Sequence, residues 1–312
     1  MTITQLQYVL AVAEYKNFTK AAERVFVTQP TLSMQVQKLE DELGVKIFDR
    51  SKKPIELTEV GQRIVDQAKS IVNESNRIQD IVDQQKGFIG GEFRLGIIPT
   101  IMPTLLPMFL QTFVKKYPKV SIKIQELTTE SILDKLREGH LDAAIAATPL
   151  SHEDIVEKPL YYEPFVGYVA PQHPLHHLKE ISTSELVPDE LLLLEDGHCF
   201  TDNILNICNT SHLPANSGFN LKSGSFETLI KLADEGLGMT LLPYLHTLDL
   251  DLKRKNNLRM FAKPYPSREV SIIHYKSELR IQIINKLHEV ILGIIKGAIA
   301  FNDVKIISPV KK

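Results

Sequence analysis

One long uninterrupted helical segment divides this sequence. Residues 58–86 contain a single glycine, Gly61, and no proline, so nothing in the segment stops a helix. A helix of this length extends about 43 Å at ~1.5 Å per residue, which is too long for a simple connector. Apolar or small residues recur along it in steps of four and three, at Ile64, Ala68, Ile71, Ser75, Ile78 and Val82. That period is typical of a coiled-coil seam.

Two roles are open for this long helix. It can pair with the same helix of a second chain and set the spacing of two copies of the region before it. Alternatively, it packs on its own chain. Ser75 interrupts the apolar seam and weakens the prediction of a coiled coil.

Length and composition exclude several classes of protein. A chain of 312 residues predicts about two domains. No stretch reaches the ~18–20 apolar residues of a membrane span, and the first residues lack the pattern of a signal peptide. We therefore expect a cytoplasmic protein. The first 65 residues hold nine Lys and Arg against eight Asp and Glu, a net of +1, so a DNA-binding surface must depend on where the charges lie.

The first 58 residues predict three short helices and a hairpin. Thr2 and Gln5 form a capping-box pattern before the first helix. Thr28 and Pro30 suit the start of the third helix, and Gly44 suits its end. This arrangement is typical of a helix-turn-helix, whose second helix enters the major groove of double-stranded DNA. The alternative is a helical bundle whose polar tips are only solvated.

Polar residues at the start of the third helix and basic residues after it are the candidate DNA contacts. A helix N-terminus favours a phosphate, and its side chains can reach base edges. The basic residues precede the alternating run 55–57, which is typical of a wing that lies on the phosphate backbone. The candidates are Thr28, Gln29, Pro30, Thr31, Ser33, Gln35, Arg50, Lys52 and Lys53.

Beyond the glycines at 87, 90 and 91, strand patterns and helix patterns alternate. The predicted strands lie at 93–98, 120–126, 142–147, 161–170, 191–194, 240–242 and 270–275, with helices at 103–116 and 129–138 between the first three. This order is typical of an α/β sheet.

Cys199 and Cys208 are the only cysteines. A structural disulfide is disfavoured in a reducing cytosol, so the two are either inert core residues or redox-active ones. A short helix over 200–208 puts Cys199 at a helix N-terminus, where the dipole lowers the thiol pKa and His198 can assist. About 13.5 Å of helix rise separates the two residues. A disulfide needs Cα atoms within roughly 7 Å, so it would unwind the helix.

The run from Phe18 to Arg50 resembles the DNA-binding motif of LysR-type transcription regulators. The matching residues are Phe18, Ala21, Ala22, Gln29, Pro30, Ser33, Val36, Leu39, Glu40, Leu43, Gly44, Phe48 and Arg50, and residues 58–61 match the end of the family's wing. Met34 stands where the family often has a basic residue. The resemblance implies an all-α winged helix-turn-helix, a long dimerisation helix and a C-terminal α/β effector domain with two lobes like those of a periplasmic binding protein.

The resemblance also implies where the domains divide, because in this fold the first lobe is completed by chain that returns from the second. The predicted parts are a DNA-binding domain at 1–58, a linker helix and hinge at 59–90, a regulatory domain at 91–301 (lobe I from 91–163 with 267–301, lobe II from 164–266) and a loose tail at 302–312. Ligands of such domains bind in the cleft between the lobes.

The run 194–199, followed by Asp202 and Cys208, resembles the peroxide-sensing members of this family. In those members hydrogen peroxide oxidises the first cysteine to a sulfenic acid, and the second cysteine resolves it to a disulfide. By motif position these are Cys199 and Cys208. Further matches, with His198, are Thr100 and Thr129 near the peroxide and Arg268 as the cation beside the thiolate. Both threonines also suit helix capping.

The sequence departs from those members around the second cysteine. Phe200 and Thr201 replace an aliphatic and a basic residue. The stretch 209–217 is longer by about two residues, and Asn220 lies near the position of an expected histidine. These departures bear on peroxide affinity and on the rearrangement.

The resemblance therefore implies a homodimeric or homotetrameric regulator of oxidant-defence genes that binds promoter DNA and RNA polymerase. We expect no enzyme activity, no cofactor and no metal, since His173, His176 and His177 are more typical of a surface loop. Two alternatives remain. A LysR-type sensor of a small metabolite would keep its response without Cys199. A thiol peroxidase would leave the N-terminal region unexplained.

Overall fold

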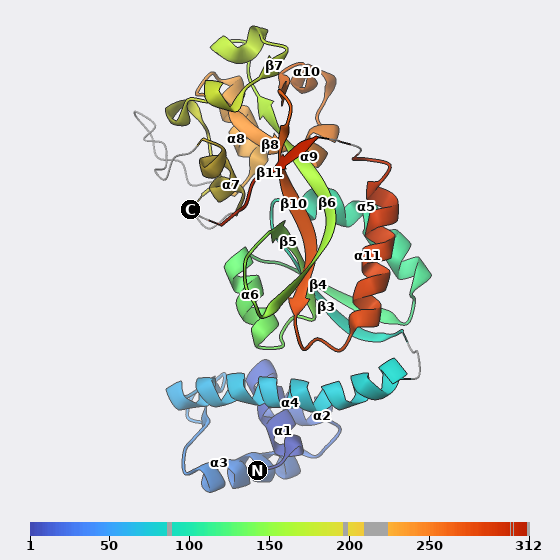
Figure 1. The fold of residues 1–312 in the computed structure, drawn as a ribbon. Coiled ribbons are helices and arrows are strands. Elements are labelled where there is room, and N and C mark those ends of the chain that lie inside the picture. The colour runs from blue at the N-terminus through green and yellow to red at the C-terminus, as the bar shows by residue number, and fades with distance from the viewer. Residues whose placement is uncertain (86–88, 196–198, 209–223, 300, 302, 311–312) are drawn as a thin grey trace. The chain divides into compact units, whose positions relative to one another are not determined.

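The computed structural model describes residues 1–85, 89–195, 199–208, 224–299, 301 and 303–310. The chain forms two compact units, divided near residue 88 (Figure 1). The first unit has its own hydrophobic core, and the second unit contains two more. Among the described residues we find no helix that combines the length and the apolar character needed to cross a membrane.

The first unit is a small helical domain. Its elements are α1 (Ile3–Tyr15), α2 (Phe18–Arg24), α3 (Gln29–Leu43), β1 (Phe48–Asp49), β2 (Glu56–Leu57) and α4 (Glu59–Gln85). β1 and β2 pair antiparallel, so the predicted wing is a hairpin. Gly61 near the start of α4 needs to be a glycine, because a Cβ there would lie 2.0 Å from the Ile47 carbonyl oxygen.

The helix ends follow the sequence signals closely. Thr2 and Gln5 form the predicted capping box of α1, and Gly44 ends α3 with a φ of 69°. The Asn17 side chain caps α2, because its Oδ1 lies next to the first turn and accepts the backbone N–H groups of both Thr19 and Lys20.

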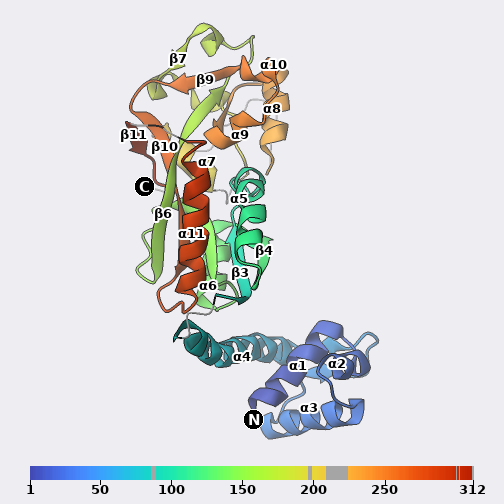
Figure 2. The ribbon, with the colours of Figure 1, turned by 90° about the vertical axis from the view of Figure 1, so that its right-hand side faces the viewer.

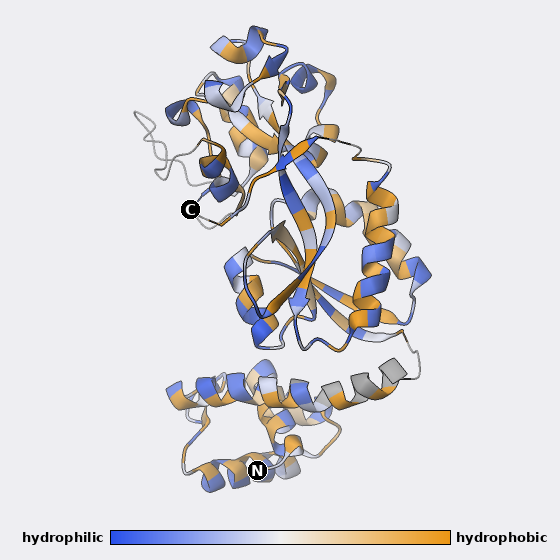
Figure 3. Ribbon diagram, in the orientation of Figure 1, coloured by the Kyte–Doolittle hydropathy of each residue, from blue (hydrophilic) through white to orange (hydrophobic). Residues whose placement is uncertain are grey.

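The long helix α4 has two different halves. Val65, Ala68 and Val72 are buried in the core that α1, α2 and α3 share, so this half packs on its own chain. Further along, Ile78 is 66% exposed and Val82 is 37% exposed. The first half therefore packs on its own chain, which is one of the two open roles, and pairing through the second half stays a prediction. Apolar residues are visible on the part of the helix that Figure 3 colours.

The second unit is an α/β domain. Its first part contains β3 (Gly91–Ile97), α5 (Met102–Lys116), β4 (Val120–Glu126), α6 (Thr129–Arg137), β5 (Ala143–Thr148) and β6 (Ile155–Tyr168). Then follow β7 (Glu180–Ile181), α7 (Cys199–Ile207), α8 (Phe226–Asp234), β8 (Thr240–Pro243), α9 (Tyr244–Leu248), α10 (Leu252–Lys255), β9 (Leu258–Phe261), β10 (Tyr265–Tyr275), α11 (Ile281–Ile295) and β11 (Val304–Ile306). Short 3-10 turns lie between β6 and α7.

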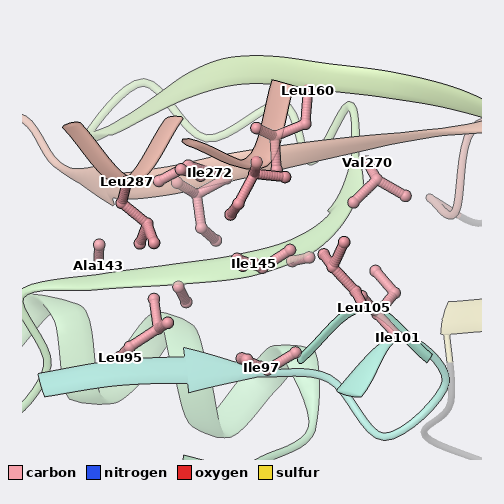
Figure 4. Close-up of a cluster of buried hydrophobic side chains, with 14 of the residues drawn as sticks. Leu95, Ile97, Ile101, Leu105, Ala143, Ile145, Leu160, Val270, Ile272 and Leu287 are labelled. Carbon is pink, nitrogen blue, oxygen red and sulfur yellow. The ribbon is translucent and has the colours of Figure 1, made fainter. Parts of the chain in front are cut away.

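Two long antiparallel strands, β6 and β10, run through both lobes of this domain (Figures 1 and 2). The sheet order is β4-β3-β5-β10-β6-β9-β7, with β8 paired to β6. Around β3, β5 and the lower part of β10, apolar side chains such as Ile145 and Ile272 form the core of lobe I, which α5 and α11 also line (Figure 4). A second core around Phe165 and Leu242 fills lobe II.

Two expectations about this domain are wrong. Residues 191–194 are buried but form only a single bridge, Leu191 with Met239, because the Leu192 carbonyl is taken by the Thr240 hydroxyl. The predicted loose tail is ordered over 303–310: β11 adds a parallel strand beside the start of β10. Its backbone bonds satisfy groups that a loose tail would leave to water.

Candidate functional site

The exposed end of α3 carries most of the predicted DNA contacts. Residues 28–31 are all exposed, and the Thr28 hydroxyl accepts the Thr31 backbone N–H, which fixes the helix start. Gln35 differs, because its Oε1 accepts a hydrogen bond from Gln5 Nε2 at 3.3 Å and so faces α1. Met34, which the sequence analysis treated only as a departure, is 61% exposed on the same helix.

Arg50 is tied to a buried carboxylate. Glu40 is 1% exposed, and its Oε1 accepts the backbone N–H groups of Ile47 and Phe48 at 2.8 and 3.2 Å. Its Oε2 accepts Arg50 Nη2 at 3.2 Å, and the Arg50 guanidinium lies 4.9 Å from the centre of the Phe18 ring. The Arg50 side chain keeps 38% of its surface exposed. The wing therefore presents a cation that is oriented but not covered.

Lys52 and Lys53 are exposed in the turn of the wing. The Lys52 ammonium lies 2.5 Å from the Glu56 carboxylate, and that hydrogen bond raises the pKa of Lys52 above its ordinary value. Lys52 is therefore charged at neutral pH and shares its charge with the Glu56 carboxylate.

Cys199 is the first residue of α7 and is 7% exposed. It packs with the core of lobe I, whereas Phe200, Ile204 and Ile207 of the same helix pack with the core of lobe II. The start of α7 thus lies where the two cores meet. Three polar groups approach the thiol from lobe I: the Thr129 hydroxyl in the segment after β4, the Ala147 backbone N–H near the carboxyl end of β5, and Arg268 near the amino end of β10.

Arg268 is a fully buried cation, 1% exposed. Its Nε and Nη2 donate to Glu163 Oε2 at 2.9 and 2.7 Å, and Glu163 is also 1% exposed. Its Nη1 donates to the Thr100 hydroxyl at 2.8 Å, and its Nη2 also donates to the Thr100 carbonyl at 3.1 Å. The guanidinium lies 5.3 Å from the centre of the Phe200 ring. Every side of this arginine is occupied, so its charge is held in place.

The remaining oxygen of Glu163 completes this arrangement. Oε1 accepts the Leu245 backbone N–H at 2.8 Å, at the start of α9. A buried carboxylate with three donors compensates the arginine charge that a core otherwise would not tolerate. The sequence analysis missed Glu163, although an acid inside the predicted apolar strand 161–170 was a signal of a buried partner.

Burial raises the pKa of the Cys199 thiol above its ordinary value of 9.0. Arg268, the Thr129 hydroxyl and the Ala147 backbone N–H act in the opposite direction, and Asp202 adds to the rise. The expected net lowering by the helix dipole is therefore wrong for this conformation, because removal from water outweighs the nearby positive charge. The reduced protein holds Cys199 as a thiol at neutral pH.

The two threonines occupy different positions. The Thr100 hydroxyl accepts from Arg268, and α5 begins only at Met102. Thr129 opens α6, but the hydroxyl that accepts the Ser131 backbone N–H belongs to Thr128. The buried Thr129 hydroxyl makes no hydrogen bond of normal geometry, although it is close enough to the Cys199 sulfur to lower the pKa. Capping thus accounts for neither threonine.

Cys208 follows directly after α7 and is half-buried against the core of lobe II. Burial alone raises the pKa of this thiol to about 11. Both cysteines are free thiols, and the intact helix lies between them. The reduced conformation therefore keeps the two sulfurs apart, as the helix geometry predicted.

Several predicted positions lie elsewhere. His198, Asn220 and the whole stretch 209–217 fall outside the described residues. His173 caps a short 3-10 turn through Nδ1, and in the described part of the chain we find no group of three metal-ligating side chains. The departure at Phe200 has a structural role that the sequence did not indicate, since its ring packs between Arg268 and the rings of Phe165 and Phe226.

Comparison with known proteins agrees with both units. Residues 3–62 match the bacterial regulatory helix-turn-helix of the lysR family, and residues 86–293 match the LysR substrate binding domain. The chain belongs to the LysR family of DNA-binding transcription regulators, which are not enzymes.

Within this family the chain is OxyR-like. It is 33% identical to a hydrogen peroxide-inducible genes activator of Pectobacterium carotovorum over 88% of this chain and 90% of that protein. Identity to the dual regulator OxyR of Escherichia coli K12 is also 33%, over 88% and 89% of the two chains. A full-length OxyR variant from Pseudomonas aeruginosa superimposes with a TM-score of 0.73 and 36% identity, covering 94% of this chain and 98% of that one. A mutant of Corynebacterium glutamicum OxyR with bound H2O2 gives 0.64 and 28%, covering 95% and 93%.

Proposed function

We propose that this LysR-family regulator senses hydrogen peroxide through Cys199 and answers with a Cys199–Cys208 disulfide. The observation that carries the proposal is the fully buried Arg268 cation, locked by Glu163 and Thr100 and acting on the Cys199 sulfur. A core cysteine that serves only packing has no need of a buried cation. The names of the related OxyR proteins support the same assignment.

The chemistry needs two balanced steps. The Cys199 sulfur attacks one oxygen of hydrogen peroxide, the O–O bond breaks, and the thiol proton leaves with hydroxide as water. The product is a sulfenic acid. The Cys208 sulfur then attacks the Cys199 sulfur, the S–O bond breaks, and a second water leaves with the Cys208 proton. Arg268 favours the anionic sulfur in the first step, and the buried Thr129 hydroxyl beside the sulfur offers peroxide a hydrogen bond.

Disulfide formation requires α7 to unwind. Nine residues of helix rise about 13.5 Å, whereas a disulfide brings two Cα atoms within roughly 7 Å. Because Cys199 packs in one core and Cys208 against the other, neither sulfur reaches its partner by a rotamer change alone. A local covalent event is thereby coupled to the packing of the whole regulatory domain.

The N-terminal DNA-binding unit then changes its contacts with promoter DNA in response to the disulfide. In the proposal, α3 enters the major groove, the wing lies on phosphates, and two chains pair through the exposed apolar half of α4 near Ile78 and Val82. A homodimer or homotetramer in the cytoplasm then alters its contacts with promoters of oxidant-defence genes and with RNA polymerase when the disulfide forms.

A footprinting experiment tests the proposal. Reduced and peroxide-treated wild-type protein is compared on promoter DNA with Cys199→Ser, and thiol trapping records the disulfide in the same samples. We expect peroxide to change the wild-type footprint and leave the Cys199→Ser footprint in its reduced form. If Cys199→Ser still changes its footprint when small metabolites are supplied, a metabolite sensor is the better assignment. Sustained peroxide consumption with an unchanged footprint contradicts the proposal.

A further inference from the structure

The segment 304–310 is bound to the regulatory domain at both of its ends. β11 runs parallel to the start of β10, with Val304 opposite Tyr265 and Ile306 opposite Ser267. The Ile307 backbone N–H donates to the Ser267 carbonyl at 2.8 Å, and Pro309 is buried. This segment therefore lies against the strand that carries Arg268, close to α7 (Figure 1).

Two asparagines of α7 hold the same segment. Asn203 Nδ2 donates to the Ile307 carbonyl at 2.7 Å, and Asn206 Nδ2 donates to the carbonyls of Ser308 and Val310 at 2.9 and 3.0 Å. Asn203 is fully buried. Residues three apart lie on one face of a helix, so the two amides grip the segment together only while α7 is helical.

Unwinding of α7 breaks this arrangement. Asn203 and Asn206 both lie between the two cysteines, in the stretch that must change shape before the sulfurs meet. Their bonds to the segment 304–310 are therefore present in the reduced form and lost in the oxidised one. A bond that is made in only one of two states shifts the equilibrium toward that state.

We infer that Asn203 and Asn206 are positioning residues that, by binding the segment 304–310, hold α7 in its helical form and set the redox potential of the Cys199–Cys208 pair. This inference rests on the proposed disulfide and names further residues that control it. We call the segment 304–310 with its bonds to Asn203 and Asn206 the clasp. The clasp stabilises the reduced state, and its release from α7 is part of the response to oxidant.

The sign of the effect follows from thiol–disulfide exchange. The two thiols react with oxidised dithiothreitol to give the protein disulfide and reduced dithiothreitol, so both sides balance in protons and electrons. Loss of the clasp destabilises the dithiol form relative to the disulfide. The equilibrium constant for disulfide formation then rises, and the midpoint potential falls by about 30 mV for each tenfold change.

The experiment is a redox titration of the full chain in dithiothreitol buffers, with the disulfide quantified by thiol trapping. The variants are Asn206→Ala, Asn203→Ala with Asn206→Ala, and a chain without residues 304–312. We expect Asn206→Ala to raise the equilibrium constant severalfold, and the double variant and the truncation to raise it by roughly tenfold or more. Asn257→Ala is the matched control, since it removes a buried amide that donates to the Tyr168 hydroxyl, away from α7.

Combining Asn206→Ala with the truncation gives a stricter test, because the two effects on the redox potential should not add. In the chain without residues 304–312, Asn206→Ala should leave the potential unchanged, because its partners are gone. Asn206 is only partly buried, so its variant reports even if Asn203→Ala fails to fold. The inference is overturned if the equilibrium constant for disulfide formation in Asn206→Ala stays within twofold of wild type. It is also overturned if Asn257→Ala shifts this constant equally. A disulfide that forms in dithiothreitol buffers but never with peroxide overturns the proposed sensing function and leaves the clasp standing.

Discussion

The DNA-reading unit and the regulatory domain each contain a buried glutamate with the same kinds of partner. Oε1 accepts two backbone N–H groups in Glu40 and one in Glu163, Oε2 accepts an arginine in both, and that arginine lies over a phenylalanine ring. Glu40 holds Arg50 in the first unit, and Glu163 holds Arg268 in the second. The arginines differ in exposure, since Arg50 keeps 38% of its side chain exposed and Arg268 only 1%.

Under the proposed function, this difference in exposure suits the two arginines to two different anions. An exposed guanidinium of fixed direction suits a phosphate that arrives from outside. A covered guanidinium cannot meet a large ligand, but it acts strongly on a neighbouring sulfur because little water screens it. In the proposal, the burial of the cation rather than its chemical type decides whether it meets a DNA phosphate or the Cys199 sulfur.

Removing each arginine in turn tests the comparison, and the largest expected effect is on the free energy of unfolding. Arg268→Ala leaves Glu163 buried without its ionic partner, and we expect a loss of ~3–5 kcal/mol in the free energy of unfolding. Arg50→Ala should lose ~1 kcal/mol or less, because the Arg50 side chain is itself 38% exposed, and Glu40 retains two backbone N–H bonds and the Lys46 ammonium 3.6 Å from its Oε2. Urea denaturation of the two variants measures both values, and equal losses would contradict the comparison.

The next effect is on the reactivity of Cys199. Because burial raises its pKa, the folded chain holds the thiol proton more tightly than the unfolded chain. That contribution to stability is complete below the ordinary pKa of 9.0 and is lost as pH rises through the raised value. In a Cys208→Ser background, the rate of Cys199 alkylation should therefore keep increasing above pH 9.0.

Arg268→Gln sharpens this prediction. Arg268 makes the strongest of the contributions that lower the Cys199 pKa, so its loss should move the alkylation profile to still higher pH and slow the reaction with peroxide. Arg50→Gln is the control and should leave the profile unchanged. A profile that stays the same in Arg268→Gln argues against a role for this cation at the sulfur.

The smallest effect concerns DNA affinity. If Arg50 contacts one phosphate, Arg50→Ala reduces the slope of log affinity against log salt by about 0.9 and weakens all sequences alike. Lys53→Ala should behave similarly, whereas Glu56→Ala frees Lys52 and should strengthen binding slightly. Fluorescence anisotropy at several salt concentrations measures the slopes. An unchanged slope in both Arg50→Ala and Lys53→Ala would remove the wing from the DNA contacts.

The sequence predicted the DNA-reading unit better than the sulfur site because the signals of the first are local. Thr2, Gln5 and Gly44 act within one helical turn of their own positions, so spacing alone places them. The Arg268 bond to Thr100 joins residues 168 positions apart, and no local pattern reports it. Only the family resemblance brought Thr100, Thr129, Cys199 and Arg268 together.

Other features escaped both kinds of reasoning. The clasp uses backbone carbonyls of residues 307, 308 and 310, and a carbonyl has no identity in a sequence. The rise in the Cys199 pKa depends on how completely the surrounding core excludes water, which is a property of packing rather than of the motif. Glu163 is different, because a charged residue inside an otherwise apolar predicted strand was a sequence signal of a buried ionic partner.

The paired strands β6 and β10 have a consequence for the kind of motion this domain permits. Their ladder runs from Ser267 and Pro164 to Tyr275 and Ile155 with one irregularity after Val270, where the register skips Leu160, and it belongs to both lobes. The two lobes therefore share one ladder, which restricts their separation as rigid bodies. Under the proposed mechanism, a change at Cys199 is then taken up by the short helices and by the edge strand β11 rather than by β6 and β10.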